Sequence, residues 1–230
     1  MLVFDLEFYV PPESRNQSRT SLIMNPTREG NIIIGGSFYQ YTGKFDPAKI
    51  NDFWIWQEDT FEPNSKKALL KSEKQTLTKI YNYIDQYAIK DQKRRDEHRK
   101  KKGYKNPAKR RITYSGIGIA RTDLPILFIR SATHKIAPST DLFEQYLSHH
   151  PFDLANALFG FVHQKPIMKP LRAEQIFKHF KIPYEKDSSK SVWEMFEKEE
   201  FQNIVERTHK EIQATIQVLQ KVKELMSQDK

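Results

Sequence analysis

The 230-residue sequence contains no cysteine and no long hydrophobic run. The absence of cysteine excludes a disulfide framework, a thiolate zinc site and a cysteine nucleophile. No apolar segment approaches the ~20 residues that a membrane-spanning helix needs, so we expect no membrane partner. The first residues, Met1 to Asp5, lack the basic segment and the small-residue cleavage site of a secretory signal. We therefore expect a soluble, cytoplasmic protein.

The formal net charge of +9 comes from one short segment of the chain. Residues 90–111 contain twelve basic and three acidic side chains, whereas basic and acidic residues are equal in number elsewhere. Such a segment can bind nucleic-acid phosphates without reading sequence, or it can be a solvated helix end or loop. The candidate nucleic-acid-binding residues are Lys93, Arg94, Arg95, Arg99, Lys100, Lys101, Lys102, Lys105, Lys109, Arg110 and Arg111.

The order of the expected elements indicates one α/β domain over residues 1–230. Segments rich in β-forming residues predict an antiparallel meander and then a fourth strand; they are residues 2–10, 32–41, 53–56 and 112–119. Apolar residues at helical spacing from Leu70 to Ala88 predict a long helix, with residues 90–111 as a basic loop or helix extension after it. Later helices are expected from Asp123 and at 153–159, 172–180 and 201–226.

Three acidic residues are candidate metal ligands. Asp5 and Glu7 lie two apart on the first strand, so their side chains point to the same face. Two acids on an otherwise apolar strand suit a hard divalent ion such as Mg²⁺ or Mn²⁺, although solvated acids at a strand edge would show the same spacing. Asp123 follows the fourth strand, where open sheets often build sites, but Asp is also a common helix N-cap.

Two motifs resemble a known family. Asp5-Leu6-Glu7 and the segment Gly116–Pro125 (GIGIARTDLP) resemble the first two motifs of DEDD-type 3′→5′ exonucleases, in the branch similar to the proofreading domain of family B DNA polymerases. The segments at 152–154, 171–183 and 191–196 agree with that family as well. The resemblance implies an RNase H-like fold: a central mixed sheet, antiparallel in its first strands and then parallel, flanked by helices, with a helical C-terminal part.

The third motif departs from the family pattern. Where the family has Tyr-x-x-x-Asp, this chain has Arg207 in the tyrosine position and Glu211 in the aspartate position. The resemblance implies that two Mg²⁺ or Mn²⁺ ions are shared by the catalytic residues Asp5, Glu7, Asp123 and Glu211. It further implies that these residues hydrolyse phosphodiester bonds at a single-stranded DNA or RNA end.

The altered motif leaves alternatives open. Arg207 either grips the scissile phosphate or replaces a metal ion as countercharge, which would leave a catalytically silent module that binds nucleic acid or a protein partner. His209 is either a general base or a packed histidine. The second alternative arises because His209 lies about 200° around the helix from Glu211. Other histidines that could act as bases are His134, His149 and His150. An endonuclease of the same fold is a third possibility.

Overall fold

The structure is a computed structural model that describes residues 1–15, 24–107, 111–162, 170–185, 187–188 and 190–228. Within these residues five strands form one sheet in the order β3-β2-β1-β4-β5. The strands are β1 (Leu2–Tyr9), β2 (Ile32–Gln40), β3 (Ile50–Trp54), β4 (Tyr114–Gly116) and β5 (Phe152–Asp153). β1 pairs antiparallel with β2 and β2 with β3, whereas β1, β4 and β5 run parallel, so the sheet is mixed.

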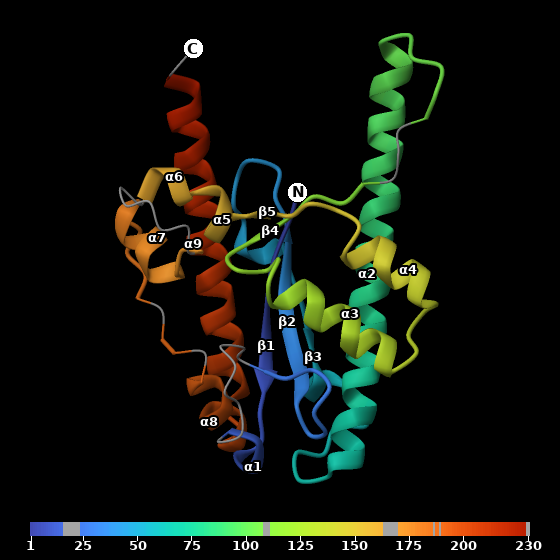
Figure 1. Ribbon diagram of the computed structural model, residues 1–230, viewed down its shortest axis with the longest axis vertical. Coiled ribbons are helices and arrows are strands. Elements are labelled where there is room, and N and C mark those ends of the chain that lie inside the picture. The colour runs from blue at the N-terminus through green and yellow to red at the C-terminus, as the bar shows by residue number, and fades with distance from the viewer. Residues whose placement is uncertain (16–23, 108–110, 163–169, 186, 189, 229–230) are drawn as a thin grey trace.

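Helices cover both faces of this sheet (Figure 1). In chain order the helices are α1 (Pro12–Arg15), α2 (Lys66–Lys101), α3 (Asp123–Thr133) and α4 (Ser139–Tyr146). They are followed by α5 (Leu154–Ala157), α6 (Phe159–Val162), α7 (Ala173–His179), α8 (Ser191–Glu197) and α9 (Phe201–Gln228). Short 3₁₀ helices η1 (Pro47–Lys49) and η2 (Ile55–Gln57) flank β3. The chain is therefore an α/β protein with a helical C-terminal part.

Alternation along β1 decides which face each side chain occupies. Leu2, Phe4 and Leu6 are buried in the core beneath α2 and α3. Val3 points the other way and packs in the core that includes α9. Asp5 and Glu7 have the same parity as Val3, so these two acids lie on the α9 face of the sheet. The sequence prediction of a shared face is thus confirmed, and the face is now specified.

Residues 90–111 were predicted to form either a basic loop or an extension of the long helix, and they extend the helix as far as Lys101. α2 is 36 residues long and continues without a break from its apolar half into the cationic half. Where the two halves of α2 meet, Asp91 stabilises the helix by ion pairs with Arg94 at 2.7 Å and Arg95 at 2.8 Å. These two residues are its i,i+3 and i,i+4 neighbours on the helix. Figure 1 shows this half of α2 extending beyond the sheet, at the end of the molecule where the N-terminus lies.

The meander prediction is confirmed, but several boundaries were wrong. β3 ends at Trp54 because the Gln57 side chain accepts a hydrogen bond from the Trp54 backbone N–H at 3.2 Å and residues 55–57 turn into η2. The fourth strand ends at Gly116, two residues before Gly118 turns the chain with a φ of +81°. The helix expected at 153–159 is divided into α5 and α6.

No helix in the described ranges is long and apolar enough to cross a bilayer.

Candidate active site

The site begins with a row of polar residues across the first three strands. Asp5 pairs with Ser37 of β2, and Ser37 pairs with Asp52 of β3, so the three side chains share the α9 face. Two glycines of β2 accompany this row. A Cβ on Gly36 would come within 2.6 Å of the Asp5 carbonyl oxygen, and one on Gly35 within 2.3 Å of the Phe53 carbonyl oxygen. Only glycine allows such a close approach of the backbones beside the acids.

Asp123 reaches the same region from the other side of β1. It is the first residue of α3 and only 5% exposed. Its Oδ1 accepts a hydrogen bond from the backbone N–H of Leu6, the residue between Asp5 and Glu7, at 3.2 Å. The Thr122 hydroxyl donates to its Oδ2 at 2.5 Å. The carboxylate is therefore held against the middle of β1, and Asp123 is not the N-cap of α3, because Thr122 takes that position.

Asp153 fixes the loop that carries Asp123. One carboxylate oxygen of Asp153 accepts hydrogen bonds from the backbone N–H of Gly118 at 2.8 Å and of Ala155 at 2.9 Å. The other accepts from the backbone N–H of Ala120 at 2.9 Å. The sequence placed Asp153 only at the start of the helix expected at 153–159, and it is the N-cap of α5. Its additional bonds make it a positioning residue for the β4–α3 loop.

The third group of side chains comes from α9. Arg207 forms an ion pair with Glu7 through its Nη1, and both side chains are almost fully buried, at 7% and 5% exposure. The Thr208 hydroxyl also lies 3.4 Å from the same Glu7 oxygen while donating to the Ile204 carbonyl at 2.8 Å. Glu211 follows Arg207 by one helical turn and is 2% exposed.

The electrostatics of Arg207 show which acids surround it. Burial lowers the pKa of the Arg207 guanidinium, but attraction by Glu7, Glu211 and Asp5 outweighs that effect, so its pKa is raised above the ordinary value. Arg207 is thus a cation buried among three of the four candidate carboxylates. The fourth, Asp123, is tied to the backbone between two of them.

The donor chemistry of this region suits a hard divalent ion, since carboxylate oxygens are the preferred ligands of Mg²⁺ and Mn²⁺. The present arrangement commits one of those carboxylates, Glu7, to Arg207. Among the described residues, no three His, Asp or Glu side chains stand close enough together to hold an ion as they are. An ion entering here would have to displace the guanidinium from Glu7.

His209 contacts Asp52, a residue that the sequence did not predict as part of the site. Its Nε2 lies 2.9 Å from both carboxylate oxygens of Asp52. The Ser37 hydroxyl donates to Asp52 Oδ1 at 2.5 Å, so Asp52 links β2 to α9. Asp52 was missed because β3 was expected to begin at Phe53, which left Asp52 in a loop. The signal that could have found it is the hairpin register, which places it in line with Asp5.

The other histidines and the basic residues lie outside this group. His134 belongs to a separate buried network, with its Nε2 2.8 Å from Glu73. His149 lies 3.4 Å from the Ser148 hydroxyl in the loop before β5. In the basic segment, the Arg99 guanidinium lies 4.7 Å from the centre of the Tyr104 ring. The predicted contacts Lys109 and Arg110 fall outside the described residues.

A comparison of the chain with protein-family models, curated protein sequences and solved structures finds no match. The resemblance to DEDD-type exonucleases therefore rests on the short motifs themselves.

Proposed function

We propose that the protein is a metal-dependent nuclease of the RNase H-like superfamily, a 3′→5′ exonuclease that acts on single-stranded DNA or RNA. The observation that carries this proposal is the position of Arg207, a guanidinium attracted by Asp5, Glu7 and Glu211 at once. Acids separated by some two hundred residues in the chain are thereby gathered at the middle of β1. A strand order of β3-β2-β1-β4-β5, with β2 antiparallel to its neighbours, supports the RNase H-like assignment.

The charge balance of the region supports a requirement for cations. Three carboxylates surround one guanidinium and a fourth, that of Asp123, is held at the same strand, so negative formal charge exceeds positive when all are ionised. Like charges held close together in a buried site repel one another, and bound cations relieve that repulsion. Asp5, Glu7, Asp123 and Glu211 would hold two ions, which when bound would activate a water molecule and stabilise the departing oxygen.

The residues of the chain itself have separate tasks in this proposal. Asp153 and the Leu6 backbone hold Asp123 in place before any ion binds. Asp52 orients His209 at the edge of the row that contains Asp5. Once released from Glu7, Arg207 is positioned to bind a substrate phosphate, because the planar guanidinium suits phosphate oxygens.

The test is cleavage of end-labelled single strands in Mg²⁺ or Mn²⁺. We expect the full chain to shorten DNA or RNA strands stepwise, and Asp5→Ala and Asp123→Ala to abolish shortening. Asp141→Asn is the matched control, since Asp141 is an exposed carboxylate on α4 and should leave the rate unchanged. Absence of shortening in both metals, with Asp5→Ala indistinguishable from the natural chain, would remove the proposal. Circular strands complete the test, because an exonuclease leaves them intact and an endonuclease opens them.

One observation favours a second function, a catalytically silent module that binds nucleic acid or a protein partner. The buried ion pair of Arg207 with Glu7 already supplies a countercharge where a metal ion would sit. Calorimetric titration with Mn²⁺ separates the two functions, because a silent module binds no ion at these acids. A large gain in cleavage by Arg207→Tyr combined with Glu211→Asp would show that the natural chain has lost the activity.

A further inference from the structure

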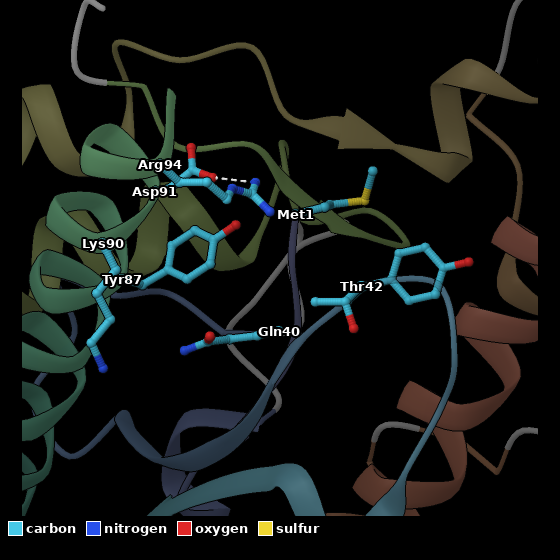
Figure 2. Close-up of a pocket in the computed structure, with 8 residues that line it drawn as sticks. Met1, Gln40, Thr42, Tyr87, Lys90, Asp91 and Arg94 are labelled. Carbon is cyan, nitrogen blue, oxygen red and sulfur yellow. Dashed lines mark hydrogen bonds and ion pairs between the residues drawn. The ribbon is translucent and has the colours of Figure 1, made fainter. Parts of the chain in front are cut away.

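A polar pocket lies away from the acids, at the base of the cationic half of α2. It has a volume of about 180 Å³ and is formed between α2, the end of β2 and the start of β1 (Figure 2). The α2 side chains that line it are Tyr87, Lys90, Asp91 and Arg94, and the strand residues are Met1, Gln40, Tyr41 and Thr42. A cavity of this size has room for several water molecules or for a phosphate group.

The pocket contains the hydroxyl of a largely buried tyrosine, Tyr87. Tyr87 is 8% exposed, and its hydroxyl forms no hydrogen bond to another described residue. Figure 2 shows that hydroxyl pointing away from α2 into the pocket. Burial raises the pKa of Tyr87 to about 12, so the hydroxyl is a protonated donor at neutral pH. Because this hydroxyl opens into the pocket, it can donate its proton to water or to a ligand that binds there.

The charges around the pocket select an anion. Asp91 is the single acid among the described residues of the lining, and two guanidinium groups, those of Arg94 and Arg95, form ion pairs with it. Lys90 lies one turn before Arg94 and makes no ion pair within the described part of the chain. Lys90, Arg94 and Arg95 therefore outweigh Asp91 by two formal charges, and most N–H donors of Arg94 remain available for an oxyanion.

The continuation of α2 indicates which anion. Beyond this pocket the helix carries a dense series of cations, the basic segment that holds the whole net charge of the protein. A small carboxylate ligand would occupy the pocket without contacting the cations farther along α2. A polyanion would contact the pocket and those cations at the same time. A phosphate group also accepts hydrogen bonds from several directions, which suits hydroxyls, amides and guanidinium groups placed on different walls.

We propose that this pocket binds one phosphate group of a nucleic-acid strand that lies along the cationic half of α2. Arg94 and Lys90 supply the charge, and the hydroxyls of Tyr87 and Thr42 supply neutral donors. The proposal shares with the proposed function only the identity of the polymer. Binding at this pocket needs neither metal nor cleavage, so either proposal can fail without the other.

The experiment measures binding of a labelled single-stranded oligonucleotide to the full chain in EDTA, where no cleavage takes place. Tyr87→Phe keeps the ring and removes the donor; we expect it to weaken binding about fivefold to tenfold without changing the unfolding midpoint at neutral pH. Lys90→Gln with Arg94→Gln should weaken binding more than the charge-matched control Lys100→Gln with Lys101→Gln. Both control residues are exposed and lie outside the pocket.

Inorganic phosphate provides the second arm. It should compete with the oligonucleotide in the natural chain and lose that effect in Tyr87→Phe. Equal weakening by the pocket pair and the control pair, with no effect of Tyr87→Phe, would mean that α2 acts by charge alone and would overturn the proposal. The proposal would also be overturned if the pocket variants weakened the binding of inorganic phosphate but not that of the oligonucleotide. In that case the phosphate that the pocket binds would not belong to a nucleic-acid strand.

Discussion

The ion pair between Arg207 and Glu7 allows the metal proposal to be tested through stability alone. Replacing Arg207 by Met keeps much of the side-chain volume and removes the charge. Glu7 then stays buried beside Asp5 and Glu211 without its cation. Removing one partner of a buried ion pair typically costs about 3–5 kcal/mol, and the exposure of only 7% and 5% for these side chains places this pair in that class.

A divalent ion that binds the same acids should reverse this loss. With an ion at 100 times its dissociation constant, the linked stabilisation is about 2.7 kcal/mol. The natural chain gains less from the same ion, because the ion must first displace the guanidinium from Glu7. We therefore expect Mn²⁺ to stabilise Arg207→Met by about 2–3 kcal/mol and the natural chain by clearly less.

Urea unfolding followed by tryptophan fluorescence, with and without Mn²⁺, measures both quantities. Lys210→Met is the matched control, because Lys210 is an exposed cation on the same helix and its loss should change stability by less than about 0.5 kcal/mol. Two results would refute the reasoning. One is a loss below about 1 kcal/mol in Arg207→Met, well under the range for a buried pair. The other is an equal effect of Mn²⁺ on all three proteins.

Three further outcomes are expected elsewhere in the chain. Glu73→Ala should lower the free energy of unfolding in urea by about 3–5 kcal/mol, because it leaves the 4% exposed Arg130 without its bidentate partner. The double variant Glu73→Leu with Arg130→Met should recover most of that loss. Asp153→Ala should slow any cleavage while reducing stability by about 1–3 kcal/mol, because the Gly118 and Ala120 N–H groups lose their acceptor; unchanged cleavage would contradict its positioning role. Burial raises the pKa of Tyr87 to about 12, so its ionisation should leave stability unchanged below pH 10 and lower it as pH rises through 12; alkaline unfolding should therefore be shallower in Tyr87→Phe.

Local patterns in the sequence were enough to place the acids on their elements. The two-residue period of a strand put Asp5 and Glu7 on one face, and the position of Asp123 after a strand put it at the start of a helix. The 3.6-residue period likewise put Arg207 and Glu211 on one side of α9. These inferences needed only the geometry of a single strand or helix.

Contacts between distant elements could not be obtained in that way. The pairing of Arg207 with Glu7 spans 200 residues and depends on how α9 crosses the sheet, which no local period encodes. Asp52 enters the site through the register of β3, and an error of three residues in the start of that strand hid it. β5 is only two residues long, too short for any periodicity to reveal.

The two proposed sites lie apart on the same sheet, the acids on its α9 face and the pocket at the end where β1 begins. Asp5 faces α9, whereas the pocket is lined by Gln40, which pairs with Leu2 on the α2 face. Asp5 lies four residues after Met1, a distance of about 13 Å along β1. A nucleic-acid strand that occupies both sites must therefore pass around the end of the sheet where β1 begins. That path sets a minimum length for a nucleic-acid strand that reaches both sites. Loss of the pocket should therefore weaken the binding of strands above that length while leaving the chemistry at the acids intact.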